Sequence, residues 1–159
     1  RAVLRINDEP AALEYARLLS VPVESLGSIV FATRPVLVRA GGRHHVRSIR
    51  GVGPDNALIF FGAVAEGMVL TLSEESSIAA HLDTALAQMR AEREPGMMLA
   101  FDCIFRRIDA ESRQLVSEVS RILREHRVAG FSTYGEQFGS MHVNQTFTGV
   151  AFYGLDDGR

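Results

Sequence analysis

Five short apolar runs follow one another between Ser28 and Ser73, and turn-forming residues separate each run from the next. Gly41-Gly42 and Pro54-Asp55-Asn56 are typical of hairpin connections. Strands that are joined by such short connections must run antiparallel. The runs, in chain order, are SIVFA, PVLVRA, HHVRSIRGV, ALIFFGAV and GMVLTLS. This stretch therefore predicts a largely antiparallel sheet.

Helical periodicity flanks the strand-rich stretch on both sides. Before it, Pro10 to Leu19 predicts a short helix. After it, Ser76 or Ser77 is expected to cap a long helix that ends at Pro95-Gly96. Its apolar stripe consists of Ile78, Leu82, Ala85, Leu86 and Met89.

A second long helix is predicted after Asp109, which we expect to be its N-cap. Arg121 and Glu125 form an i,i+4 pair on the exposed side of this helix. Its apolar face consists of Leu115, Val116, Val119, Ile122 and Leu123.

Four further segments are typical of strands: Arg1–Ile6, Met97–Phe105, Val128–Gly135 and Val143–Gly154. The expected fold class is α+β, with a largely antiparallel (mixed) sheet, two long helices and one short N-terminal helix. The strand–helix–strand order late in the chain also permits one parallel pairing. We expect a single domain over residues 1–155, followed by a tail or linker at 156–159.

Charge and composition exclude several classes of function. The chain has 17 basic and 19 acidic residues, a formal charge of −2, and arginine at every basic position. A chain without lysine has no amine for a Schiff base and no P-loop lysine. Its balance of charge is not that of a nucleic-acid or membrane-surface binder. The single cysteine, Cys103, cannot form an internal disulfide.

Cys103 is the first candidate for chemistry. It lies in FDCIFRR, where strand alternation would place Phe101, Cys103 and Phe105 on one face and Arg106 on the other. A cysteine between two phenylalanines is typical of a buried thiol that packs as a small hydrophobe. The alternative places Cys103 and Arg106 at the end of a strand, where they line a pocket.

The second candidate is the stretch Gly130–Thr146, in which polar groups are concentrated between two apolar strands. One hypothesis is a hairpin connection whose polar groups satisfy one another. The other is a ligand-recognition loop, in which Glu136 accepts a hydrogen bond from an ammonium group and Asn144 and Thr146 offer further hydrogen bonds. Convergent polar groups on an apolar background are typical of small-molecule pockets.

Histidines give no metal-binding spacing. His44 and His45 would point to opposite faces of one strand, and His81 and His126 fall on predicted helices. A haem group needs only one axial histidine, so haem remains possible through His44, His45 or His142.

At the level of motifs the chain resembles the C-terminal half of the FIST sensory domain of bacterial signal-transduction proteins. RINDEPAALEYARLL is similar to the opening of that family, and Pro35–Leu72 to its central β-region. FDCIFRR is similar to its phenylalanine–cysteine–arginine motif, and GFSTYGEQFGSMHVNQTFTGV to its terminal signature.

The resemblance implies a non-catalytic, cytoplasmic input domain that binds a small ligand such as an amino acid, or haem. It also implies partners: an N-terminal FIST half, a histidine kinase, cyclic-di-GMP enzyme or chemoreceptor output module, and a second copy in a homodimer. We therefore expect the chain to be a fragment of a longer protein. The expected ligand-binding residues are Cys103, Arg106, Tyr134, Glu136, His142, Asn144 and Thr146.

Two other classes of function remain open at this point. The first is a hydrolase or amidase in which Cys103 is the nucleophile, a histidine such as His142 the base, and Glu136 the residue that orients it. The second is a dimerisation or scaffold module without a ligand.

Overall fold

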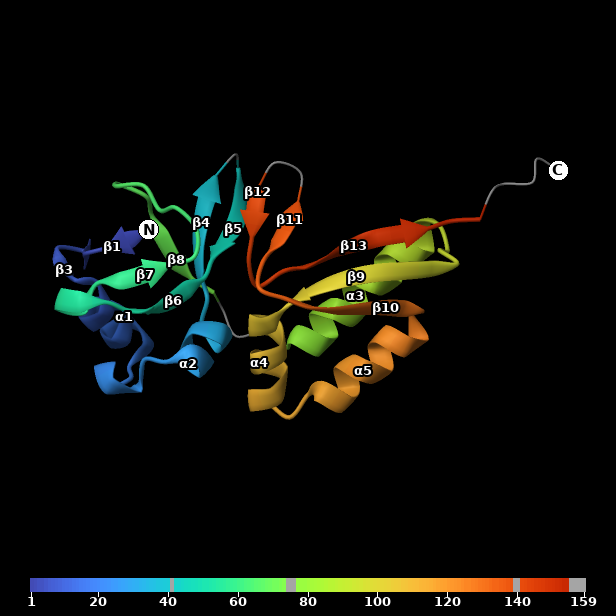
Figure 1. The fold of residues 1–159 in the computed structure, drawn as a ribbon, viewed down its shortest axis with the longest axis horizontal. Helices are drawn as coiled ribbons and strands as arrows, with labels where there is room; N and C mark the ends of the chain where they lie inside the picture. The colour runs from blue at the N-terminus through green and yellow to red at the C-terminus, as the bar shows by residue number, and fades with distance from the viewer. Residues whose placement is uncertain (41, 74–76, 139–140, 155–159) are drawn as a thin grey trace.

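The structure, a computed structural model, describes residues 1–40, 42–73, 77–138 and 141–154. It is α+β, as predicted, and consists of two bodies that lie side by side (Figure 1). The first body contains the strand-rich half of the chain, and the second contains everything from the first long helix onward. The expected tail, residues 156–159, lies outside the described residues, and so does Ser76.

The first body is built from antiparallel strand pairs, as the turn pattern predicts. One sheet has the order β1-β7-β6, a second has the order β5-β4-β8, and β2 pairs with β3. Two α-helices and two short 3-10 helices complete it. The strands are β1 (Ala2–Val3), β2 (Arg5–Ile6), β3 (Glu9–Pro10), β4 (Val36–Ala40), β5 (Arg43–Arg47), β6 (Ile49–Val52), β7 (Leu58–Phe60) and β8 (Leu70–Leu72), and the helices are α1 (Ala11–Leu19), η1 (Val23–Ser25), α2 (Ser28–Thr33) and η2 (Pro54–Asn56).

The strand prediction for SIVFA is wrong, because these residues form α2. A short apolar run has the same composition whether it is a buried strand or a buried helix turn. Here Phe31 packs beside Tyr15 in the core, with ring centroids 6.2 Å apart. The helix ends before Pro35, since the residue that precedes proline disfavours helical angles.

The second body has the mixed sheet that the sequence allows. β9 (Met97–Cys103) lies between β10 (Val128–Thr133), to which it is parallel, and β13 (Phe147–Phe152), to which it is antiparallel. Helices α3 (Ile78–Glu92) and α5 (Val116–Glu125) pack on one face of this sheet (Figure 1). The strands β11 (Glu136–Phe138) and β12 (Met141–Val143) form a separate hairpin that lies beside β5.

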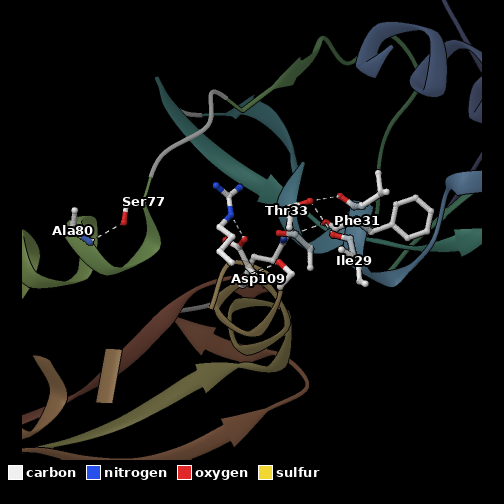
Figure 2. Close-up of polar contacts among 11 residues, drawn as sticks. Ile29, Phe31, Thr33, Ser77, Ala80 and Asp109 are labelled. Atoms are coloured by element: carbon white, nitrogen blue, oxygen red, sulfur yellow. Dashed lines mark hydrogen bonds and ion pairs between the residues drawn. The ribbon is translucent and has the colours of Figure 1, made fainter. Parts of the chain in front are cut away.

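Ser77 caps α3, in agreement with the sequence. The backbone N–H of Ala80 donates to the Ser77 hydroxyl over 3.3 Å, as Figure 2 shows. This bond satisfies one of the donors that the first turn of a helix leaves without an internal partner.

Two predicted boundaries around residue 104 are wrong. The strand that starts at Met97 ends at Cys103, and Ile104 begins a separate helix, α4 (Ile104–Ser112). Asp109 therefore lies inside α4 and is not a cap; its carboxylate accepts from Arg113 Nε over 2.6 Å (Figure 2). The i,i+4 pairs of α4 favour helix here, and α4 in turn packs against α2 of the first body. The expected pair of Arg121 with Glu125 is present, at 2.6 Å.

Burial in the core of the second body predicts which truncated side chains lower its free energy of unfolding. Ile122 of α5 is 1% exposed and packs with Leu82, Leu86 and Met98, whereas Val116 on the same helix is 42% exposed. Ile122→Ala should lower the free energy of unfolding by about 2–5 kcal/mol, because it removes buried methyl groups and leaves a cavity. Val116→Ala, as the matched control, should change it by less than about 0.5 kcal/mol. Chemical denaturation of both variants measures the difference, and equal losses would contradict this packing.

Candidate functional site

A cavity of about 450 Å³ lies between α3 and the strands β9 and β13. One wall is the stripe of Leu82, Leu86 and Met89, whose spacing places the three side chains on one face of α3. The other wall contains Met98 and Ala151, which are register partners in the sheet. The volume is within the range of about 300–1,000 Å³ that is typical of small-molecule sites.

Arg106 of α4 forms a polar end of the cavity together with Gln145 and Thr146, which precede β13, and His81 of α3 is a further polar residue of the lining. The side chain of Arg106 is only 13% exposed. Its Nε donates to Asp102 Oδ1 over 2.6 Å, and its guanidinium lies over the ring of Phe147, 5.7 Å from the centroid. Two contacts therefore fix the orientation of a cation at this end.

Asp102 lies on the far side of that ion pair. It lines a second hollow, of about 380 Å³, together with Ser132 of β10 and Leu123 of α5. Burial raises the pKa of Asp102 above its ordinary value, against the opposing effect of Arg106, and the charge of Glu136 adds to the rise. Ala100 and Phe147 line both cavities, so the two adjoin, and the ion pair contributes its cation to the lining of one and its carboxylate to the lining of the other.

Glu136 is a buried carboxylate, 4% exposed, whose two oxygens accept hydrogen bonds from threonine hydroxyls. Thr133 at the end of β10 donates to one oxygen, and Thr146 donates to the other over 2.6 Å. The carboxylate therefore joins the strand before the β11–β12 hairpin to the segment after it. This arrangement supports the hypothesis that Glu136 holds the loop.

Gln145 joins the same loop to the first body. Its side-chain oxygen accepts from the Ser48 hydroxyl over 2.8 Å, and its amide nitrogen donates to the carbonyls of Ala32 over 2.8 Å and Phe31 over 3.2 Å. The residue has φ of +54°, a conformation that only a minority of non-glycine residues adopt. Sequence reasoning did not single out Gln145, because its partners are about a hundred residues away.

The remaining residues of the expected site are placed outside the cavity. Tyr134 is 83% exposed, and His142 is exposed, with Nε2 against Gly135. Asn144 is buried, and its Nδ2 lies 2.9 Å from the position that a Cβ on Gly135 would occupy. Gly135 has φ of +137°, so this position needs glycine for both its backbone angle and its neighbours. Of the seven expected residues, Arg106 and Thr146 line the cavity.

Cys103 is a core residue at 1% exposure, which confirms the buried interpretation. It packs with Ala32 and Phe105, and Phe105 stacks edge-on against Phe61 at 5.6 Å. Burial raises the pKa of the Cys103 thiol above its ordinary value, although backbone N–H groups of Phe105 and Gln145 oppose the rise. A thiol in this setting is a weak nucleophile.

The histidines named for haem do not line either cavity. His44 and His45 lie on β5 and His142 on β12, on the hairpin side of the molecule. These residues do not fit a haem in the cavity beneath α3. Within residues 1–40, 42–73, 77–138 and 141–154, no three of the His, Cys, Asp and Glu side chains are grouped as metal ligands. The same residues contain no helix that is long and apolar enough to span a membrane.

Comparison with known proteins identifies the family. The model of the FIST C domain matches residues 11–139. The chain belongs to the FIST C domain family. This family is a sensory domain family of signal transduction, so the resemblance that the motifs indicate is confirmed. Neither the curated proteins nor the solved structures contain a match to the chain.

The burial of Cys103 makes a prediction about its reactivity. A thiol-specific reagent at neutral pH should leave the native FIST C domain unlabelled on the timescale on which it labels the unfolded chain completely, because the sulfur is buried and its pKa is raised. Labelling is followed by intact mass. Rapid modification of the native protein would show that the thiol is accessible and would contradict this placement.

The bonds of Glu136 predict a structural cost for its removal. Glu136→Gln should lower the free energy of unfolding by about 1–3 kcal/mol, because a buried acceptor of two hydroxyl bonds loses its charge and one acceptor oxygen. The melting temperature should fall by about 2–4 °C per kcal/mol. Glu118→Gln, on the exposed surface of α5, is the matched control and should have the melting temperature of the wild type. An unchanged melting temperature for Glu136→Gln would favour the recognition hypothesis for the loop.

Proposed function

We propose that this FIST C domain is a non-catalytic, cytoplasmic input domain that binds a small organic molecule in the cavity beneath α3. It passes the signal to an output module, either fused or separate, such as a histidine kinase, a cyclic-di-GMP enzyme or a chemoreceptor. The observation that carries the proposal is the cavity itself, which has apolar walls from α3 and the sheet and a few polar lining residues, Arg106 among them. A small number of oriented polar groups on an apolar background is the usual composition of a ligand site.

A route from the cavity to the rest of the molecule supports a signalling role. Thr146 lines the cavity and donates to Glu136, which also holds Thr133. The neighbouring Gln145 lines the same end and is bonded to α2 and to Ser48. A ligand that displaces this segment would act on the β11–β12 hairpin and on the first body together.

The geometry gives less support to an enzyme based on Cys103. Such an enzyme needs a thiolate, a base and an orienting group within hydrogen-bond distance of one another. Cys103 is buried in a cluster with Ala32 and Phe105, whereas His142 is exposed beside Gly135. Both oxygens of Glu136 are bonded to threonine hydroxyls.

Thermal-shift measurements with and without a blocked cavity test the proposal. A panel of amino acids, organic acids, sugars and nucleosides is screened against the wild type. A ligand at a hundred times its Kd stabilises a protein by about 2.7 kcal/mol, which corresponds to a shift of roughly 5–10 °C. Ala85→Phe places a ring at the cavity lining and should abolish the shift.

Ala87→Phe is the matched control, because Ala87 is exposed on the same helix, as Ala85 is, but does not line the cavity. It should retain the full shift. A ligand that stabilises Ala85→Phe as strongly as it stabilises the wild type would bind elsewhere and would contradict the proposed site.

A further inference from the structure

The charge distribution around the cavity beneath α3 is one-sided. Among the residues that the structure describes, its lining contains two that can carry positive charge, Arg106 and His81, and no aspartate or glutamate. Asp102, the carboxylate that pairs with Arg106, lines the other cavity. A group that enters the polar end therefore meets hydrogen-bond donors on a cation and no anionic partner.

The hydrogen-bond donors at this end also differ in how many of their N–H or O–H groups already have a partner. The hydrogen bond that Arg106 makes within the described residues uses Nε, and a guanidinium has five N–H groups. The four N–H groups on its two terminal nitrogens are left as donors. The Thr146 hydroxyl already donates a hydrogen bond to Glu136. The side-chain amide of Gln145 is hydrogen-bonded to Ser48, Ala32 and Phe31. A planar acceptor with two oxygens is the natural complement of the free guanidinium edge.

The body of the cavity selects the other end of the ligand. Leu82, Leu86 and Met98 are each 4% exposed and form apolar walls on both sides. At roughly 30 Å³ for each water-sized atom, a volume of about 450 Å³ holds on the order of fifteen such atoms. This is enough for a short alkyl or aryl chain together with its head group.

We propose that the cavity ligand is a small amphiphilic anion, a carboxylate whose head binds Arg106 and whose apolar tail lies between α3 and the β9–β13 sheet. The inference rests on the proposed function, since it assigns a ligand class to the same cavity. An α-ammonium group would meet no carboxylate among the described residues that line this cavity, so a free amino acid is a poorer ligand than the corresponding deaminated acid.

Asp102 gives the proposal a distinctive consequence. It holds Arg106 through Nε, so it competes with the ligand for the charge of the guanidinium. Removing that competitor should tighten anion binding, whereas damage to a merely structural ion pair would weaken it. The two partners of one ion pair therefore predict opposite effects on affinity.

The test uses four probes that share one six-carbon chain: hexanoate, hexanamide, hexylamine and 2-aminohexanoate. Isothermal titration calorimetry on the full chain should show hexanoate binding at least tenfold more tightly than hexanamide, because the charge-assisted bond is worth about tenfold to a hundredfold. Hexylamine should show no binding, and 2-aminohexanoate should bind more weakly than hexanoate.

Variants assign the effect to Arg106. Arg106→Met should weaken hexanoate at least tenfold, and Asp102→Asn should tighten it severalfold. Arg107→Met is the control, because Arg107 is the adjacent cation, is exposed and pairs with Glu111; it should leave the affinity unchanged. If Arg106→Met does not fold, the Asp102→Asn variant and the four probes on the wild type still test the proposed ligand class.

Three outcomes would overturn the inference. The first is hexylamine or 2-aminohexanoate binding more tightly than hexanoate; if Ala85→Phe abolishes that binding, the cavity keeps its proposed function and only the ligand class fails. The second is weaker hexanoate binding in Asp102→Asn. The third is no binding of hexanoate at all, and the proposed function then fails as well only if no member of the screening panel shows a shift that depends on the cavity.

Discussion

The hydrogen bonds of Gln145 tie the two bodies of the domain together. The side-chain amide spans 113 residues of sequence to the carbonyl of Ala32 and is also bonded to the hydroxyl of Ser48. The same loop receives the backbone N–H of Cys103, which donates to the carbonyl of Thr146 over 3.1 Å. The loop is therefore fixed by contacts to α2 and β9 together. Those contacts set the position of Thr146 at the polar end of the cavity.

The ion pair of Asp102 with Arg106 is the second constraint on the site. It forms where β9 ends and α4 begins, so the change from strand to helix at Ile104 brings the two side chains together. Removing either partner of such a pair is costly in free energy, because the charge that remains would be largely buried and poorly solvated. In the ligand mode that we propose, the pair also selects for the charge of the ligand, because Arg106 lines the first cavity and Asp102 the second.

Much of the architecture could be predicted from local pattern. The turn dipeptides predict the antiparallel first half, and the stripe from Ile78 to Met89 predicts α3 with its cap at Ser77. The SIVFA segment was assigned as a strand because its apolar run fits either structure, and packing of Phe31 against Tyr15 decides for helix. Likewise Asp109 has a cap composition, but the helix begins at Ile104, and Arg107 and Glu111 form an i,i+4 pair around Asp109 within it.

The site could be predicted only in part. Arg106 and Thr146 come from the family motifs and line the cavity, whereas Tyr134 and His142 from the same motifs are exposed. The apolar stripe of α3 is visible in the sequence, but periodicity does not distinguish a stripe that fills a core from one that borders a cavity. Gln145 could not be found, because nothing local indicates a partner as distant as Ala32.

Hydrogen–deuterium exchange with and without saturating hexanoate tests the central claim most directly, since it locates the bound state along the chain. The account predicts slower exchange in α3 and in residues 145–151, the segments that enclose the cavity. The exposed hairpin tip around Gln137 and Phe138 should change least. Protection confined to the β11–β12 hairpin, with α3 unchanged, would place the ligand in the loop and would contradict the cavity as the site.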